Sequence, residues 1–100
     1  MTLEEFEWAK KILDISISMP LVQIEKKYKS RLKQLHPDVS GLEPETAKEK
    51  TSDLNRAMNI VREFCKNYQF DFSTEQFLYQ HPEERLQKMF WKDIRTDNKA

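Results

Sequence analysis

Hydrophobic residues in the first two thirds of the chain recur at intervals of three and four, the spacing of one face of an α-helix. The first such pattern predicts a helix from about residue 3 to about residue 14, and Thr2 with Glu5 has the spacing of a capping box at its start. The following residues, ISISMP, predict an extended connector, because Pro20 disfavours the α conformation at Met19.

A second helix is expected to start near Pro20. Five hydrophobic positions fall in one arc of this helix and predict its core face: Leu21, Ile24, Tyr28, Leu32 and Leu35. At about 100° per residue, three lysines gather on the opposite side and are called the lysine stripe below: Lys26, Lys29 and Lys33. Lys27 and Arg31 lie on the flanks.

The lysine stripe has almost no acidic neighbours. Glu25 is the only carboxylate between Pro20 and Asp38, so the positive face of this helix is left largely uncompensated. On a typical surface helix such lysines are simply solvated. The missing acids favour a further role in contact with another molecule.

The tripeptide His36-Pro37-Asp38 follows the second helix and is called the tip below. Pro37 is expected to end that helix, because its ring disfavours the α conformation at His36 and removes a backbone donor. The residues VSGLEP then predict a loop, with Gly41 free to take a positive φ and Pro44 suited to the first turn of another helix.

A third helix is expected from about residue 45 to about residue 68. Its continuous hydrophobic stripe predicts the core positions Ala47, Leu54, Ala57, Met58, Val61, Phe64, Cys65 and Tyr68. Two helices joined by a short loop should lie antiparallel and bury these stripes against each other. The tip would then lie exposed at the turn of a helical hairpin.

The last thirty residues predict one or two short helices. Ser73 with Gln76 again has capping-box spacing, and Pro82 could open a final helix before the polar DIRTDNKA frays. The fold class is therefore all-α, an antiparallel helical hairpin with a packed N-terminal helix and one or two short C-terminal helices. We expect a domain over 1–70 and a helical extension over 71–100 that packs on it, pinned by Phe90 and Trp91.

Composition agrees with a small helical domain. The 100 residues suffice for one core, and one glycine among 38% hydrophobic and 34% charged residues disfavours turn-rich β structure. Seventeen basic residues balance seventeen acidic ones, so no overall field draws the chain to nucleic acid or to a membrane. A lone Cys65 and the lack of a signal sequence or long apolar run predict a reduced, cytoplasmic protein without membrane contact. We also expect a monomer.

Few residues could carry catalysis or bind a metal. His36 and His81 are far apart in sequence, the chain has one cysteine, and it has no glycine-rich phosphate loop. His36 and Asp38 alone make too few ligands for a stable metal site. We therefore expect no enzymatic activity of its own, no metal and no cofactor.

Three blocks in the same order carry a resemblance to a known family. QIEKKYKSRLKQLHPD is similar to the second helix and the invariant tripeptide of the J-domain, the module of DnaJ-like co-chaperones. ILDIS resembles the end of the first helix of that family, and DLNRAMNIV resembles its third-helix signature. Three positions depart from the family pattern, namely Ser30, Arg31 and Thr51. The fourth helix, the glycine- and phenylalanine-rich region and the zinc module of larger members are not evident.

The resemblance implies a co-chaperone that binds a DnaK-type 70 kDa heat-shock chaperone and stimulates its ATP hydrolysis. The chain would be an allosteric activator, with the ATP chemistry left to its partner. Carried onto this sequence, the chaperone-binding residues are His36, Pro37, Asp38, Lys26, Lys29, Lys33 and Tyr28. Tyr28 is also expected to contribute to the core.

Two alternatives stay open. A nucleic-acid-binding helical module could use the positive face of the second helix, although the zero net charge and the acidic first helix argue against it. A regulatory J-like subunit could pair with another J-domain without activating a chaperone. The intact tip argues against that role, because degenerate members of the family characteristically lose it.

Overall fold

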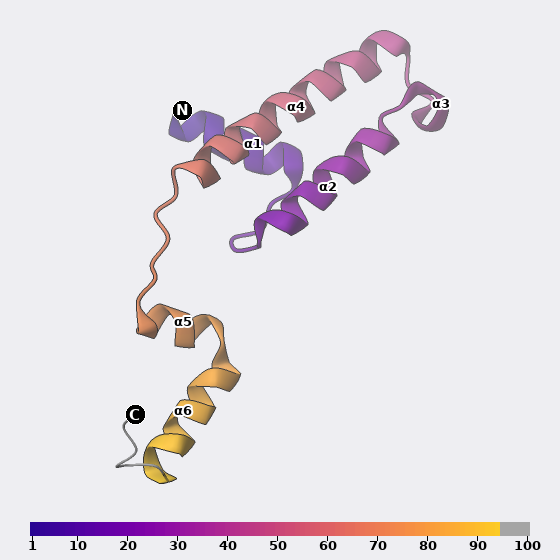
Figure 1. Cartoon of the computed structure of the whole chain (residues 1–100). Helices are drawn as coiled ribbons and strands as arrows, with labels where there is room; N and C mark the ends of the chain where they lie inside the picture. The colour runs from indigo at the N-terminus through magenta and orange to yellow at the C-terminus, as the bar shows by residue number, and fades with distance from the viewer. Residues whose placement is uncertain (95–100) are drawn as a thin grey trace. The chain divides into compact units, whose positions relative to one another are not determined.

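The computed structural model describes the backbone of residues 1–94 and the side chains of residues 1–89, and this part is helical without strands (Figure 1). Its helices are α1 (Leu3–Leu13), α2 (Leu21–Gln34), α3 (Pro37–Ser40), α4 (Pro44–Lys66), α5 (Thr74–Gln80) and α6 (Pro82–Ile94). The all-α prediction is confirmed. The chain forms two compact units, one over Met1–Tyr68 and one that starts at Gln69.

The first unit is built on a helical hairpin. Helices α2 and α4 run antiparallel, and α1 lies against α4 (Figure 1). A single hydrophobic core joins the three helices and contains Ala9, Leu13, Ile24, Leu54, Ala57, Met58 and Val61. The predicted hairpin with a packed N-terminal helix is thus observed.

Helix α1 begins and ends as local chemistry dictates. The Glu5 N–H donates to Thr2 Oγ1 over 3.1 Å and the Thr2 N–H donates to Glu5 Oε1 over 3.0 Å, which completes the predicted capping box. At the other end, Asp14 takes a left-handed conformation with φ of 54° and receives the Lys27 ammonium on its carbonyl oxygen over 2.6 Å. This contact ties the middle of α2 to the end of α1.

The prediction of a loop over VSGLEP is wrong in its first half. Residues Pro37–Ser40 form the short helix α3, because Pro37 supplies a preset φ at the first helical position and the His36 carbonyl accepts from Val39 and Ser40 over 2.9 and 2.8 Å. Gly41 ends this helix with φ of 72°, the positive value expected for it.

Three hydrophobic positions expected in the core are exposed instead. They are Leu21 at the start of α2, Phe64 in the last turn of α4 and Tyr68 just beyond it. Each lies near a helix end, where the facing helix no longer covers it. Phe64 instead packs its ring on Phe6 at 4.7 Å between centroids, and Tyr68 packs on Phe64 at 5.8 Å.

The second unit contains the two predicted short helices. Ser73 caps α5 through Oγ, which accepts from the Gln76 N–H over 3.1 Å, but the Ser73 N–H donates to Asp71 Oδ1 over 2.9 Å in place of the reciprocal bond expected from Gln76. Hydrogen bonding to Ser73, above all to its N–H, lowers the pKa of Asp71 below its ordinary value. Helix α6 opens at Pro82 as expected and includes the first two residues of DIRTDNKA.

Three sequence-based expectations for the C-terminal part stay open. The fraying of residues 95–100 and the pinning roles of Phe90 and Trp91 lie outside the described residues. Packing of the extension on the first unit stays a prediction. Among the described residues, no helix combines the length and the apolar character needed to cross a bilayer.

Asp14 provides a test of this local account. Because an L-residue is strained in the left-handed region, Asp14→Gly should raise the free energy of unfolding by about 0.5–1 kcal/mol. The carbonyl that accepts from Lys27 is kept in this variant. The control Asp14→Ala keeps the strain and loses the carboxylate, so it should not gain stability. If thermal unfolding shows the alanine variant to be as stable as the glycine variant, or more stable, backbone strain at Asp14 is not the cause.

Candidate functional site at the α2–α3 tip

The tip protrudes at the turn of the hairpin. The side chain of His36 is 63% exposed and that of Asp38 is 89% exposed, and Pro37 is also exposed. His36 Nδ1 accepts from the Asp38 N–H over 3.3 Å and lies 3.8 Å from the Asp38 carboxylate. No core residue depends on these side chains. The tip is therefore a solvent-facing polar group that is shaped locally by one weak cap and one proline.

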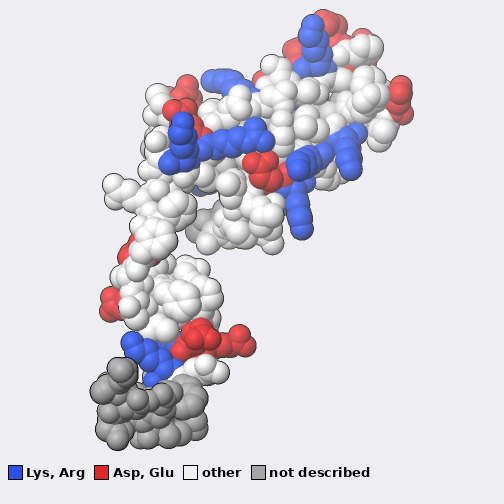
Figure 2. Space-filling view, in the orientation of Figure 1, with Lys and Arg blue, Asp and Glu red and all other residues white. Residues whose placement is uncertain are grey.

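The lysine stripe is exposed along α2. In the part of the chain that the structure describes, Lys26, Lys29 and Lys33 form no ion pair. Figure 2 shows basic side chains gathered over α2 on the viewed face of the first unit. The neighbouring Lys27 differs from the stripe, because it bonds to Asp14 at the end of α1. Positive charge on the stripe thus remains open to a partner.

An ion pair fixes α2 against α4. Arg62 donates from Nη2 and Nε to the two carboxylate oxygens of Glu25 over 3.0 and 3.2 Å. Hydrogen bonding to Arg62 is the main cause that lowers the pKa of Glu25, and the field of Lys29 adds to it. The only carboxylate within α2 is therefore bonded to Arg62 of α4, and its charge also acts on Lys29 of the lysine stripe.

Tyr28 lies at the same junction. Its hydroxyl donates to Asn55 Oδ1 over 2.6 Å, and the Arg62 guanidinium lies over its ring at 5.3 Å from the centroid. The side chain is half-buried between α2 and α4. The structure thus gives Tyr28 the expected core contact, and its hydroxyl is engaged within the fold.

Sequence patterns alone did not identify Arg62 and Asn55 as residues that support the site. Asn55 entered only through the resemblance of DLNRAMNIV, and nothing marked Arg62 as the partner of Glu25. The two members of that pair are 37 residues apart, so no local spacing signals them. A lone carboxylate inside a basic helix was the one available hint.

Among the described residues, no group of three or more His, Cys, Asp or Glu side chains is placed to hold a metal ion. Burial raises the pKa of the Cys65 thiol, which keeps it protonated and poorly nucleophilic. What the tip and the lysine stripe offer is a surface for docking.

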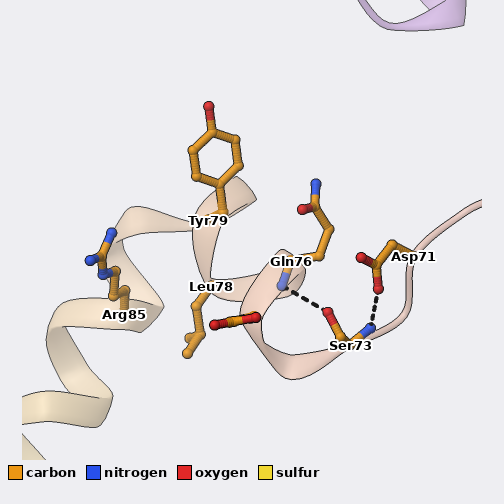
Figure 3. Close-up of a pocket in the computed structure, with 7 residues that line it drawn as sticks. Asp71, Ser73, Gln76, Leu78, Tyr79 and Arg85 are labelled. Atoms are coloured by element: carbon orange, nitrogen blue, oxygen red, sulfur yellow. Dashed lines mark hydrogen bonds between the residues drawn. The ribbon is translucent and has the colours of Figure 1, made fainter.

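The second unit carries a pocket of about 390 Å³ that contains none of the predicted site residues. Figure 3 shows Asp71, Ser73 and Gln76 joined by hydrogen bonds, with Leu78, Tyr79 and Arg85 on the neighbouring turns. The polar groups of the capping turn bond to one another here. The chain has a second His-Pro pair, His81-Pro82, which lies at the start of α6. The His81 ring stacks on the Phe77 ring.

Comparisons with protein-family models, with curated proteins and with solved structures found no match. The residues of the tip, the lysine stripe and the α2–α4 junction are therefore the basis for inferring a function.

Tyr28→Phe tests whether the α2–α4 junction contributes to the fold. Loss of the hydroxyl leaves Asn55 Oδ1 without its protein donor, so the free energy of unfolding should fall by about 1 kcal/mol in urea titration. Tyr79→Phe in α5 is a matched control, since Tyr79 is exposed and has no such bond. It should change stability by less than about 0.5 kcal/mol. Equal effects of the two substitutions would refute the assigned role of Tyr28.

Proposed function

We propose that this chain is a J-domain co-chaperone that binds a DnaK-type 70 kDa heat-shock chaperone and stimulates its ATP hydrolysis through the tip. The observation that carries the proposal is the tripeptide itself, exposed at the end of a basic helix and free of any evident role in the core. A polar tripeptide of this kind contributes little to folding. Exposed at the hairpin turn, it is available for contact with another molecule.

Each residue of the tip has a definite chemical part in such a contact. Pro37 fixes the backbone where α3 begins, so the two flanking side chains are presented from a preset turn. Asp38 offers a compact carboxylate that can accept both arms of an arginine fork. His36 has one ring nitrogen near the Asp38 backbone and a second nitrogen free to bond a partner.

The lysine stripe supports the proposal through long-range attraction. Three ammonium groups without ion pairs in the described structure would steer α2 onto an acidic surface and raise the association rate, an effect that fades with salt. The resulting complex would be small and transient. Tyr28, with its hydroxyl bonded to Asn55, would act mainly by holding α2 in place, and the exposed part of this half-buried side chain would add contact area.

Activation would follow from differential binding. A module that binds the hydrolysis-competent arrangement of the ATPase more tightly than the resting one shifts that population without donating a catalytic group. The chain would then be an allosteric activator with no enzyme activity, cofactor or metal of its own. It would act as a monomer in the cytoplasm.

Asp38→Asn is the direct test. Single-turnover ATP hydrolysis by a DnaK-type chaperone should be accelerated about 5- to 150-fold by the wild-type chain, the range of a typical allosteric coupling. Asp38→Asn should lose this acceleration while its circular dichroism and thermal midpoint stay unchanged, because the carboxylate is exposed in the free protein. Glu45→Gln is the control, since it removes an exposed carboxylate from the first turn of α4 and should stimulate like wild type.

Two results would defeat the proposal. Full stimulation by Asp38→Asn would show that the tip is not the activating contact, and unfolding of that variant would show that the tip is structural. Salt-sensitive binding of DNA or RNA by the wild-type chain, retained in Asp38→Asn, would instead support the nucleic-acid-binding alternative.

A further inference from the structure

A second docking feature lies in the first unit, where α1, α2 and α4 meet. A cavity of about 230 Å³ opens there to the surface. Its apolar lining comes from one residue of each segment, Ile12 in α1, Leu35 at the end of α2 and Leu54 in α4. Leu54 is buried and the other two are half-buried, so the lining is the outer edge of the hydrophobic core.

The mouth of the cavity carries two cations that the fold does not use. Arg31 of α2 and Lys50 of α4 both line it, and neither forms an ion pair within the described residues. Asp53 is the one carboxylate among the lining residues, and Gln34 adds a neutral polar group. The lining therefore combines an apolar base with a net positive edge.

The size of the cavity limits what can fill it. Pockets for small-molecule ligands usually measure about 300–1,000 Å³, and this one is smaller. It has room for one aliphatic side chain. A mononucleotide or a stacked base would leave its polar atoms unpaired against Ile12, Leu35 and Leu54.

The cavity is also separate from the lysine stripe. Arg31 and Lys33 are two positions apart on α2, which places them about 160° from each other around the helix. A molecule seated over Arg31 would therefore leave Lys33 available. Two different ligands could bind the first unit at once.

We propose that this cavity is a docking site for an acidic segment of a partner protein, one that inserts a single leucine-like side chain between flanking carboxylates. The aliphatic group fills the space between Ile12, Leu35 and Leu54, and the carboxylates reach Arg31 and Lys50. Charge complementarity selects this occupant, because a basic or neutral segment would leave both cations without partners. Asp53 adds discrimination by repelling a carboxylate placed on its side of the mouth.

Amide chemical shifts of the ¹⁵N-labelled full chain test the site directly. The probe is a blocked pentapeptide with one central leucine and two acidic residues on each side. It should shift the amides around Leu35 and Leu54, with a dissociation constant at least about tenfold lower than that of the same peptide with a central alanine, because the leucine side chain is buried on binding. A leucine peptide flanked by lysines should not bind at the cavity.

Three variants complete the test. Lys50→Glu should weaken binding of the acidic leucine peptide about two- to fivefold, the range expected for one surface ion pair. Lys48→Glu changes an exposed lysine of the same helix outside the cavity and should bind like wild type. Arg31→Leu fills the cavity from its own edge and should abolish the shifts, while its circular dichroism spectrum stays that of a folded helical domain.

Several outcomes would overturn the site. They are equal binding of the leucine and alanine peptides, equal effects of Lys50→Glu and Lys48→Glu, or shifts at the cavity caused by an oligothymidine probe and not by the acidic peptide. The titration contains no chaperone, so its failure would leave the proposed ATPase activation untouched.

Discussion

The packing of α2 against α4 is the constraint on which the rest of the structure depends. Ile24 is buried in the core cluster that also contains Met58 and Val61 of α4, and on the same two helices Tyr28 bonds to Asn55 while Glu25 pairs with Arg62. Together these interactions set the rotation of α2 about its own axis. With that rotation fixed, the lysine stripe faces solvent and the tip emerges at the end of the hairpin.

The charges of α2 divide into two groups with different tasks. Lys27 and Glu25 are used internally, one on the end of α1 and the other on α4. Lys26, Lys29 and Lys33 form no ion pairs in the described structure. Arg31 lines a small cavity on another side of the helix. A single helix thus contributes to the core, to two interhelical contacts and to two separate candidate binding surfaces.

Local patterns in the sequence were sufficient to predict the long helices that position the candidate site. Periodicity and capping residues predicted α1, α2 and α4 closely, because both signals depend on neighbours within one or two turns. They missed α3, since a four-residue helix is too short to show a period. They also placed Phe64 in the core, because a periodic stripe does not reveal where the facing helix stops. The Glu25–Arg62 pair depends on the register of two distant segments and could not be read from spacing.

The central claim is that the tip and the lysine stripe form one contact surface for an ATPase chaperone. The most direct test is a map of amide line broadening in the ¹⁵N-labelled full chain as ATP-bound DnaK-type chaperone is added. The account predicts broadening at Lys26, Lys29, Lys33, His36 and Asp38, with the buried amides of α1 little affected until the complex is saturated. Broadening confined to residues from Gln69 onward, or none at all, would contradict it.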